Sequence, residues 1–309
     1  MSMKSTWLRA ANRDHAKLAG LPRTRLLSLF STLRYITSHP LNAGHPVKAV
    51  SRFVRWQIES RLKDEVEVEW IEGSRLVVKR GMTGATGNVY CGLHEFVDMA
   101  FLLHLLRPDD LFVDIGANVG SYTVLASKVC GARTICVEPD PVTAAALRRN
   151  ILANGIEERV IVEETALGAS EGTVNFTVGL DTINRVAARE ETNVQEVRLA
   201  RLDAVLGCEQ PALIKMDVEG FEAEVLRGAA DTLAKTGLLG IITEDTGAGV
   251  VDTLTAHGFT RWYYDPVERE LSQIGPVQPS NNGIFLRANP VVADRLRDAR
   301  KFAVMGKEI

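Results

Sequence analysis

The chain has 309 residues, of which 46% are hydrophobic and 24% are charged, and its formal net charge is -3. That size and apolar content suffice for one large globular domain with a smaller added element. The longest apolar runs are far shorter than the roughly 20 residues that a membrane-spanning helix needs. Arg23, Arg25 and Arg34 interrupt any secretory apolar segment, so we expect a cytoplasmic protein.

The four cysteines show no C-x-x-C pairing, so we expect reduced, mostly buried thiols rather than metal ligands or disulfides. They are Cys91, Cys130, Cys136 and Cys208.

Basic residues concentrate at the N-terminus. Residues 1–63 hold 12 Lys and Arg against 2 Asp and Glu, and the rest of the chain holds 24 against 37. Such an arm suits an anionic membrane surface or a phosphate-bearing glycan carrier. Alternatively, it packs on the acidic body or on a second subunit, as in a homodimer. The sequence shows no basic patch interleaved with aromatic residues, so we expect no nucleic-acid partner.

Four patterns precede the first strand expected in the main sheet. Apolar residues spaced by three and four predict a helix over 46–62, and two extended runs around a turn predict a hairpin over 66–79. The glycine-rich segment 81–92 predicts a loop. The almost wholly apolar segment 94–106 predicts a buried helix, which Pro108 stops.

From residue 111 short apolar strands alternate with helices, which predicts a mostly parallel sheet with helices on both faces. Strands are expected at 111–114, 133–137, 159–163, 173–178, 194–199, 212–216 and 238–243, and helices at 119–129, 141–153, 222–233 and 250–257. Extended runs at 260–264 and 283–287 predict an antiparallel edge pair. We assign 1–80 to a basic helical arm and hairpin, 81–290 to a Rossmann-like domain, and 291–309 to a C-terminal helix.

The segment 111–120, LFVDIGANVG, joins a buried strand that ends in a carboxylate to a glycine turn and a helix. Gly116 and Gly120 allow a tight turn and the close approach of a ligand. Dinucleotide enzymes use G-x-G-x-x-G here to receive a pyrophosphate. In this chain Asn118 replaces the second glycine and Asp114 would repel the phosphates. The cationic donor S-adenosylmethionine suits an acidic strand end better; a nicotinamide-dependent oxidoreductase is the alternative.

Glu138 closes the next strand, 24 residues after Asp114. A carboxylate at this position can accept hydrogen bonds from both hydroxyls of a ribose. Nicotinamide enzymes place an acid at a similar distance from their glycines. Glu138 therefore supports an adenosine ligand without choosing between the two classes.

These motifs together resemble the FkbM family of S-adenosylmethionine-dependent methyltransferases. The matching stretches are GLHEF at 92–96, VDIGANVGSYT at 113–123, CVEPDP at 136–141, LRRNILANG at 147–155, ALGASEG at 166–172 and IKMDVEGFEAEVLRGA at 214–229. The last is the most specific, because generic methyltransferases lack it. The resemblance covers roughly residues 90–245.

The resemblance implies an α/β, class I methyltransferase fold with a seven-stranded sheet, mostly parallel with an antiparallel edge hairpin. It also implies a donor site across the ends of the first two strands. Asp114, Gly116, Ala117, Asn118 and Gly120 would surround the methionine part, Glu138 would hold the ribose, and Pro139, Thr165 and Ala166 would contact adenine. Glu95 is also assigned to the donor site, and its alternative role is that of a base or a ligand of the acceptor.

Candidate bases follow the predicted fourth strand, which should lie beside the first. Asp217 and Glu219 would then lie near the donor methyl group, with His94 and Glu244 as further candidates. Lys215 precedes Asp217 by two residues, so the two could form an ion pair. Alternatively, Asp217 and Glu219 cap the next helix. Carboxylates suit magnesium, but no spacing singles out a metal site and we assign none.

The resemblance implies O-methylation of a hydroxyl on a sugar, a polysaccharide intermediate or a secondary metabolite. We expect the loops 80–92, 179–193 and 265–282 to select this small-molecule or glycan acceptor. The alternatives are the oxidoreductase and a non-catalytic module that docks on a membrane or a partner through the basic arm.

Overall fold

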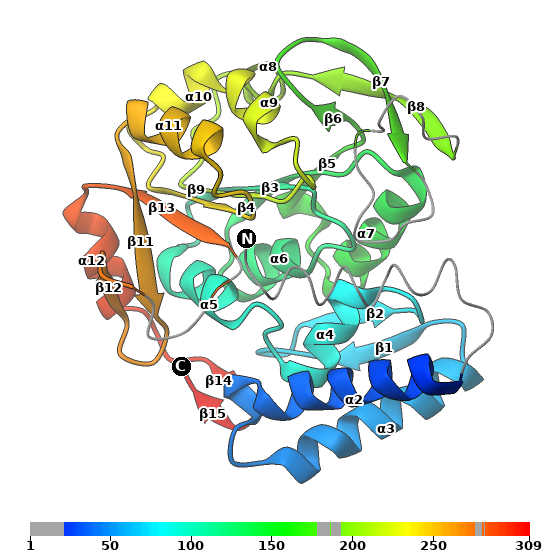
Figure 1. Ribbon diagram of the computed structural model, residues 1–309. Helices are drawn as coiled ribbons and strands as arrows, with labels where there is room; N and C mark the ends of the chain where they lie inside the picture. Colours follow the sequence, from blue (N-terminus) through cyan, green and yellow to red (C-terminus); the bar gives the residue numbers. More distant parts are fainter. Residues whose placement is uncertain (1–21, 178–185, 187–192, 276–279, 281) are drawn as a thin grey trace.

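A computed structural model describes residues 22–177, 186, 193–275, 280 and 282–309 (Figure 1). The expected loop at 179–193 therefore lies almost wholly outside the described residues. The central element is an eight-stranded sheet in the order β12-β11-β13-β10-β9-β3-β4-β5. Its strands are β3 Leu111–Ile115, β4 Arg133–Val137, β5 Val160–Glu163, β9 Leu213–Met216, β10 Gly240–Thr243, β11 Phe259–Asp265, β12 Glu270–Ser272 and β13 Gly283–Arg287.

The strands β5, β4, β3, β9 and β10 are parallel neighbours. β13 pairs antiparallel with β10 and with β11, so the expected edge pair forms, although β13 is the inner strand. The expected count of seven strands is too low by one, because β12 returns antiparallel along β11.

Helices cover both faces of the sheet (Figure 1). Because side chains alternate along a strand, Phe112 packs in one core cluster with α5, and Val113 packs in the other with α9. The helices around the sheet are α5 Phe96–Leu105, α6 Ser121–Val124 with a π-helical turn at Leu125–Val129, α7 Pro141–Asn154, α8 Leu202–Leu206, α9 Glu222–Arg227, α10 Ala230–Ala234, α11 Ala248–Ala256 and α12 Pro290–Arg297. The predicted alternation is confirmed.

The N-terminal elements pack on the main domain through α7. Asn150 and Asn154 of that helix bond the backbone of the second hairpin strand at Val77 and Arg75, with N–H···O distances of 2.6 and 2.8 Å. The elements are α2 Pro22–Ser38, a 3-10 turn Pro40–Asn42, α3 Pro46–Leu62, β1 Val66–Glu69, β2 Arg75–Val78 and α4 Thr83–Cys91. A separate small sheet contains β6 Ala166–Leu167, β7 Gly172–Thr177 and β8 Val194–Ala200.

Three sequence predictions are wrong in detail. The expected loop at 81–92 is mostly helix α4, in which Gly87 leaves room for His94: a Cβ there would lie 2.4 Å from Nδ1 of that ring. The helix expected at 222–233 is divided after Arg227 because Gly228 approaches the carbonyl oxygen of Gly168. The helix expected at 291–309 ends at Arg297, and a short hairpin of β14 Ala303–Val304 and β15 Lys307–Glu308 follows.

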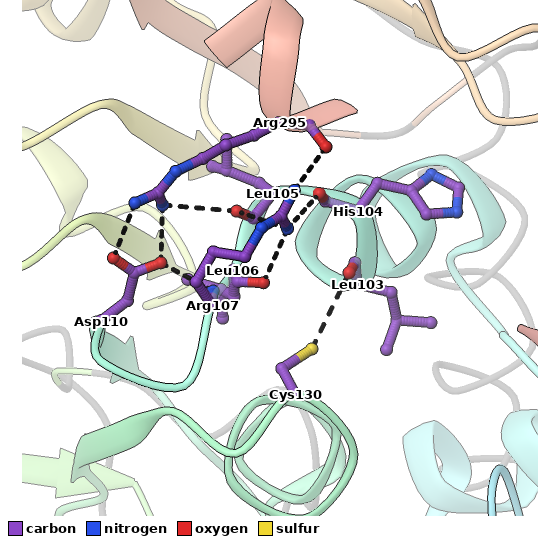
Figure 2. A network of polar contacts seen from close by, with 8 residues as sticks. All are labelled: Leu103, His104, Leu105, Leu106, Arg107, Asp110, Cys130 and Arg295. Carbon is purple, nitrogen blue, oxygen red and sulfur yellow. Dashed lines mark hydrogen bonds and ion pairs between the residues drawn. The ribbon is translucent and has the colours of Figure 1, made fainter. Parts of the chain in front are cut away.

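A polar network fixes the chain just before β3 (Figure 2). The Arg107 guanidinium donates to the carbonyl oxygens of His104 and Leu106 at the end of α5 and to that of Arg295 in α12. The Arg295 guanidinium pairs with both carboxylate oxygens of Asp110, at 2.6 and 3.2 Å. This network joins α5, α12 and the start of β3, and thereby positions the strand that leads to the glycine turn.

We expect Asp110→Ala to lower the free energy of unfolding by about 2 kcal/mol, because the variant removes a bidentate, half-buried pair. Urea unfolding of the full chain measures the change. Asp109→Ala, at an exposed neighbouring position, is the matched control and should leave stability unchanged. Equal stability of the two variants would contradict this account of the junction.

Candidate active site

A cavity opens at the carboxyl ends of β3, β4 and β9, with an empty volume of about 1020 Å³ that includes its open mouth. This is the sheet edge where ligands bind in open α/β folds. Ten of the fourteen residues expected at the site line it: His94, Glu95, Gly116, Ala117, Asn118, Glu138, Pro139, Thr165, Ala166 and Asp217. The other four, Asp114, Gly120, Glu219 and Glu244, do not line this cavity.

The glycine turn after β3 has the geometry that the sequence predicts. Gly116 and Gly120 have φ values of 71° and 87°, in the left-handed region. A Cβ on Gly116 would lie 1.9 Å from the carbonyl oxygen of Asp217. The turns after β3 and β9 therefore touch, and only glycine fits between them.

Two other residues hold left-handed backbone at these strand ends. Asn118 has a φ of 51° and Glu219 a φ of 52°. Asparagine tolerates this conformation, whereas glutamate rarely adopts it, and such strain is concentrated at functional sites. The backbone thus marks the ends of β3 and β9 as the two sides of one site.

Glu138 is anchored by backbone donors at the end of β4. Its Oε2 accepts from the amide of Asn118 at 2.9 Å, and its Oε1 accepts from the amide of Asp140 at 3.0 Å. Burial raises the pKa of its carboxyl to about 7, although these two amide donors act in the opposite direction. Each oxygen retains a further acceptor site, so the carboxylate can bind the two hydroxyls of a ribose.

Asp114 lies behind the cavity wall. Its Oδ2 accepts from the hydroxyl of Thr123 at 2.7 Å, while Oδ1 is buried without a hydrogen-bond partner. Burial raises the pKa of this carboxyl, and the nearby Lys215 opposes that rise. An unpaired buried carboxylate oxygen is costly, so this position favours a cationic ligand nearby.

Lys215 is the buried cation of the site. It faces Asp114 across the β3–β9 pair, and its Nζ lies 3.0 Å from Oδ2 of Asp217 and 5.1 Å from the centre of the Tyr122 ring. Although burial opposes it, the carboxylates of Asp217, Asp114 and Glu95 raise the pKa of this amine. The predicted ion pair with Asp217 is therefore present, and it orients that carboxylate in the cavity wall.

The three expected acids after β9 and β10 come together. One carboxylate oxygen each from Asp217, Glu219 and Glu244 lies within 4.8 Å of the others. Burial, and then the charges of Asp217 and Glu219, raise the pKa of Glu244. The cluster can take up a proton from an acceptor, and its oxygens are also of the type that binds divalent cations.

The alternative role for Asp217 and Glu219, capping the helix α9, stays a prediction, since the N-cap residue is Phe221 and its side chain makes no capping hydrogen bond. α9 begins at Glu222, whose Oε1 accepts from the amide of Val218 at 3.4 Å.

A polar network at the start of α5 was not predicted from the sequence. Glu95 accepts from the Tyr122 hydroxyl at 2.9 Å and from the Asn282 amide at 3.1 Å. The buried Asp98 accepts from Asn282 at 3.0 Å and from the Ser280 hydroxyl at 2.7 Å. Burial and the neighbouring Glu95 raise the pKa of Asp98. Asp98 is the one acidic residue inside the otherwise mostly apolar segment 96–106, and that interruption was the available signal.

His94 lies in the cavity wall, and its hydrogen-bond partners lie in the N-terminal helices α2 and α4. Its Nδ1 lies 2.7 Å from the hydroxyl of Tyr35 in α2, and its amide donates to Asn88 at 2.8 Å. Burial lowers the pKa of the imidazole. The neutral imidazole of His94 therefore forms part of the cavity wall and connects it to α2 through Tyr35. A role for His94 as a base stays a prediction.

The strand order, with the antiparallel β13 inserted between the parallel β10 and β11, is that of a class I methyltransferase. Residues 114–260 match the family model described as the methyltransferase FkbM domain. The match confirms the resemblance to FkbM-type methyltransferases that the sequence motifs indicated, over this segment of the chain.

Curated relatives cover part of the chain. The chain is 29% identical to the 2-O-methyltransferase NoeI of Sinorhizobium fredii, over 43% of this chain and 62% of that protein. It is 28% identical to the 31-O-demethyl-FK506 methyltransferase FkbM of Streptomyces tacrolimicus, over 53% of this chain and 79% of that protein. It is 27% identical to the hexuronic acid methyltransferase AglP of Haloferax volcanii, over 43% of this chain and 55% of that protein. The match thus spans less than two thirds of NoeI and of AglP.

Solved structures show a more distant likeness. A mutant of MtNAS in complex with S-adenosylmethionine has a TM-score of 0.42 at 14% identity and covers 94% of this chain and 100% of that chain. A methyltransferase from Thiobacillus denitrificans in complex with S-adenosylhomocysteine has a TM-score of 0.32 at 10% identity. It covers 48% of this chain and 46% of that chain. The fold assignment therefore rests on the strand order and the family match.

The cavity fits S-adenosylmethionine, the methyl donor of this family. Glu138 offers two oxygens for a ribose, and the glycine turn leaves room for a close approach. The unpaired oxygen of Asp114 and the carboxylates of Glu95 and Asp217 provide negative charge for a sulfonium and an ammonium group.

We expect the affinity for S-adenosylhomocysteine to rise by up to about tenfold between about pH 6 and pH 8. The pKa of Glu138 is raised to about 7, so its acceptor form is scarce at the lower pH and dominant at the higher one. Calorimetric titration at several pH values measures this dependence.

Glu138→Gln should bind weakly at every pH and lose this slope, whereas Glu164→Gln, at an exposed position, should retain it. An unchanged slope in Glu138→Gln would contradict the assigned role of this carboxyl.

Proposed function

We propose that the protein is an S-adenosylmethionine-dependent O-methyltransferase acting on a hydroxyl of a sugar, a polysaccharide intermediate or a secondary metabolite. The observation that carries the proposal is the Asp217 carboxylate, which lines the cavity beside the glycine turn and is held there by Lys215. NoeI and FkbM are O-methyltransferases by name and AglP is a hexuronic acid methyltransferase, which supports a hydroxyl acceptor on a glycan or a small metabolite.

The chain's own residues supply alignment and a proton acceptor. Methyl transfer to oxygen is an in-line displacement, in which the donor sulfur keeps the electron pair of the broken bond and the acceptor loses its proton. Oδ2 of Asp217 is engaged by Lys215, so we expect Oδ1 to accept the proton of the acceptor hydroxyl. Glu244, in contact with the same cluster, is the second candidate for this role.

A cytoplasmic location is part of the proposal. All four cysteines are unbridged, as the sequence predicts, which accords with a reducing compartment.

Asp217→Asn should lower the rate of methyl transfer by about 10²- to 10⁴-fold, the usual contribution of a positioned base. S-adenosylhomocysteine affinity should change little, which separates chemistry from donor binding. Transfer of a labelled methyl group to hydroxyl-bearing glycans and metabolites provides the assay.

Asp252→Asn, at an exposed position on α11, is the matched control and should keep full activity. If an active acceptor is found and Asp217→Asn turns it over at the rate of the unchanged chain, Asp217 is not the base.

We expect methyl transfer to persist after removal of divalent cations with EDTA. Lys215 already balances the charge of Asp217, so this carboxylate does not require a metal ion for charge balance. The rate before and after EDTA treatment measures this. Loss of activity that magnesium restores would show that the three carboxylates are a metal site instead.

A further inference from the structure

Helices α2 and α3 form the outermost layer of the N-terminal part, on the far side of the β1–β2 hairpin from the central sheet (Figure 1). The inner face of α3 is formed by Ala49, Phe53, Trp56 and Ser60, which are buried. This face explains why the helix packs on the domain. The opposite face of α3 is exposed.

The outer face of α3 carries large apolar side chains in solvent. Val47 is 81% exposed, Val54 48%, Ile58 55% and Leu62 79%. Their spacings of seven, four and four residues place them in one stripe along the helix. Phe30 of the neighbouring α2 is also 69% exposed. Ser51 separates Val47 from the other three along the stripe. Four large apolar residues on one face are still more than the scattered exposure that needs no explanation.

Basic residues border this stripe on both sides. At 100° per residue, Arg61 lies on one border, and Lys48 and Arg55 lie on the other. Lys63 follows directly at the end of the helix. All four are exposed, and Glu59 is the one acid within α3. The face is therefore apolar along its centre and cationic at its edges.

We propose that this outer face of α3 docks on an anionic lipid surface. Apolar side chains along the centre would enter the interfacial region, while lysine and arginine would extend to the headgroups. The excess of 12 basic over 2 acidic residues in 1–63 adds attraction to anionic lipids. None of the described helices is long and apolar enough to cross a bilayer, so the contact is peripheral.

The basic borders of this face favour a membrane over a second copy of the chain as its partner. In a twofold dimer through this face, the basic borders of one copy would lie against those of the other, and like charges would repel. An anionic surface meets the same borders with the opposite sign. The proposal does not depend on the methyltransferase function.

The docking face is one helix away from the cavity. α3 packs on α2, and Tyr35 of α2 contacts His94 in the cavity wall at 2.7 Å. A membrane-bound protein would therefore hold its donor cavity near the lipid surface.

Sedimentation of the full chain with vesicles tests the proposal. The protein should bind vesicles that contain phosphatidylserine, fail to bind pure phosphatidylcholine, and lose binding as salt is raised. The double variants Ile58→Asp/Leu62→Asp and Lys48→Glu/Arg55→Glu should each weaken binding by about tenfold or more. Val267→Asp, at a 61% exposed position between β11 and β12, should bind as the unchanged chain does.

S-adenosylhomocysteine affinity, measured on the same variants, shows that they are folded and separates this proposal from the proposed function. Absence of binding to phosphatidylserine vesicles would overturn the proposal, as would equal binding by the α3 variants. A dimer of the unchanged chain in light scattering that Ile58→Asp/Leu62→Asp disrupts would also overturn it, because the face would then be a contact between copies.

Discussion

The site depends on one buried ammonium group. Lys215 lies inside the sheet edge, next to Asp114 across the β3–β9 pair and in an ion pair with Asp217. A buried lysine is costly unless carboxylates compensate it, and here Asp114, Asp217 and Glu95 raise its pKa together. Three carboxylates around one ammonium leave an excess of negative charge at the cavity wall. This excess is what makes the site suitable for a cationic donor and unsuitable for a pyrophosphate.

The backbone around this charge group is equally constrained. Gly116 leaves space for the carbonyl oxygen of Asp217, so the turns after β3 and β9 form one unit. Asn118 in the first turn and Glu219 in the second both hold left-handed backbone. The polar network of Arg107, Asp110 and Arg295 fixes the entry to β3 from behind (Figure 2). The proposed sites of donor binding and acceptor deprotonation therefore lie at two adjoining strand ends whose turns are in contact.

Local patterns in the sequence predicted most of this arrangement. The strand at 133–137 has its predicted bounds, and ten of the fourteen expected site residues line the cavity, because strand periodicity and glycine turns are encoded over a few residues. The helix α4 was missed because one of its glycines, Gly87, leaves space for the ring of His94, which lies outside the segment 81–92. The contact of Asp98 with Ser280 and Asn282 joins residues more than 180 positions apart, and no local pattern reports such a contact.

The central claim is that the acidic strand ends and the Asn118 turn form a methyl-donor site. Calorimetric titration of the full chain with S-adenosylmethionine, and separately with NADH, tests it most directly. The account predicts saturable binding of S-adenosylmethionine and no binding of NADH. Binding of NADH without binding of S-adenosylmethionine would contradict it.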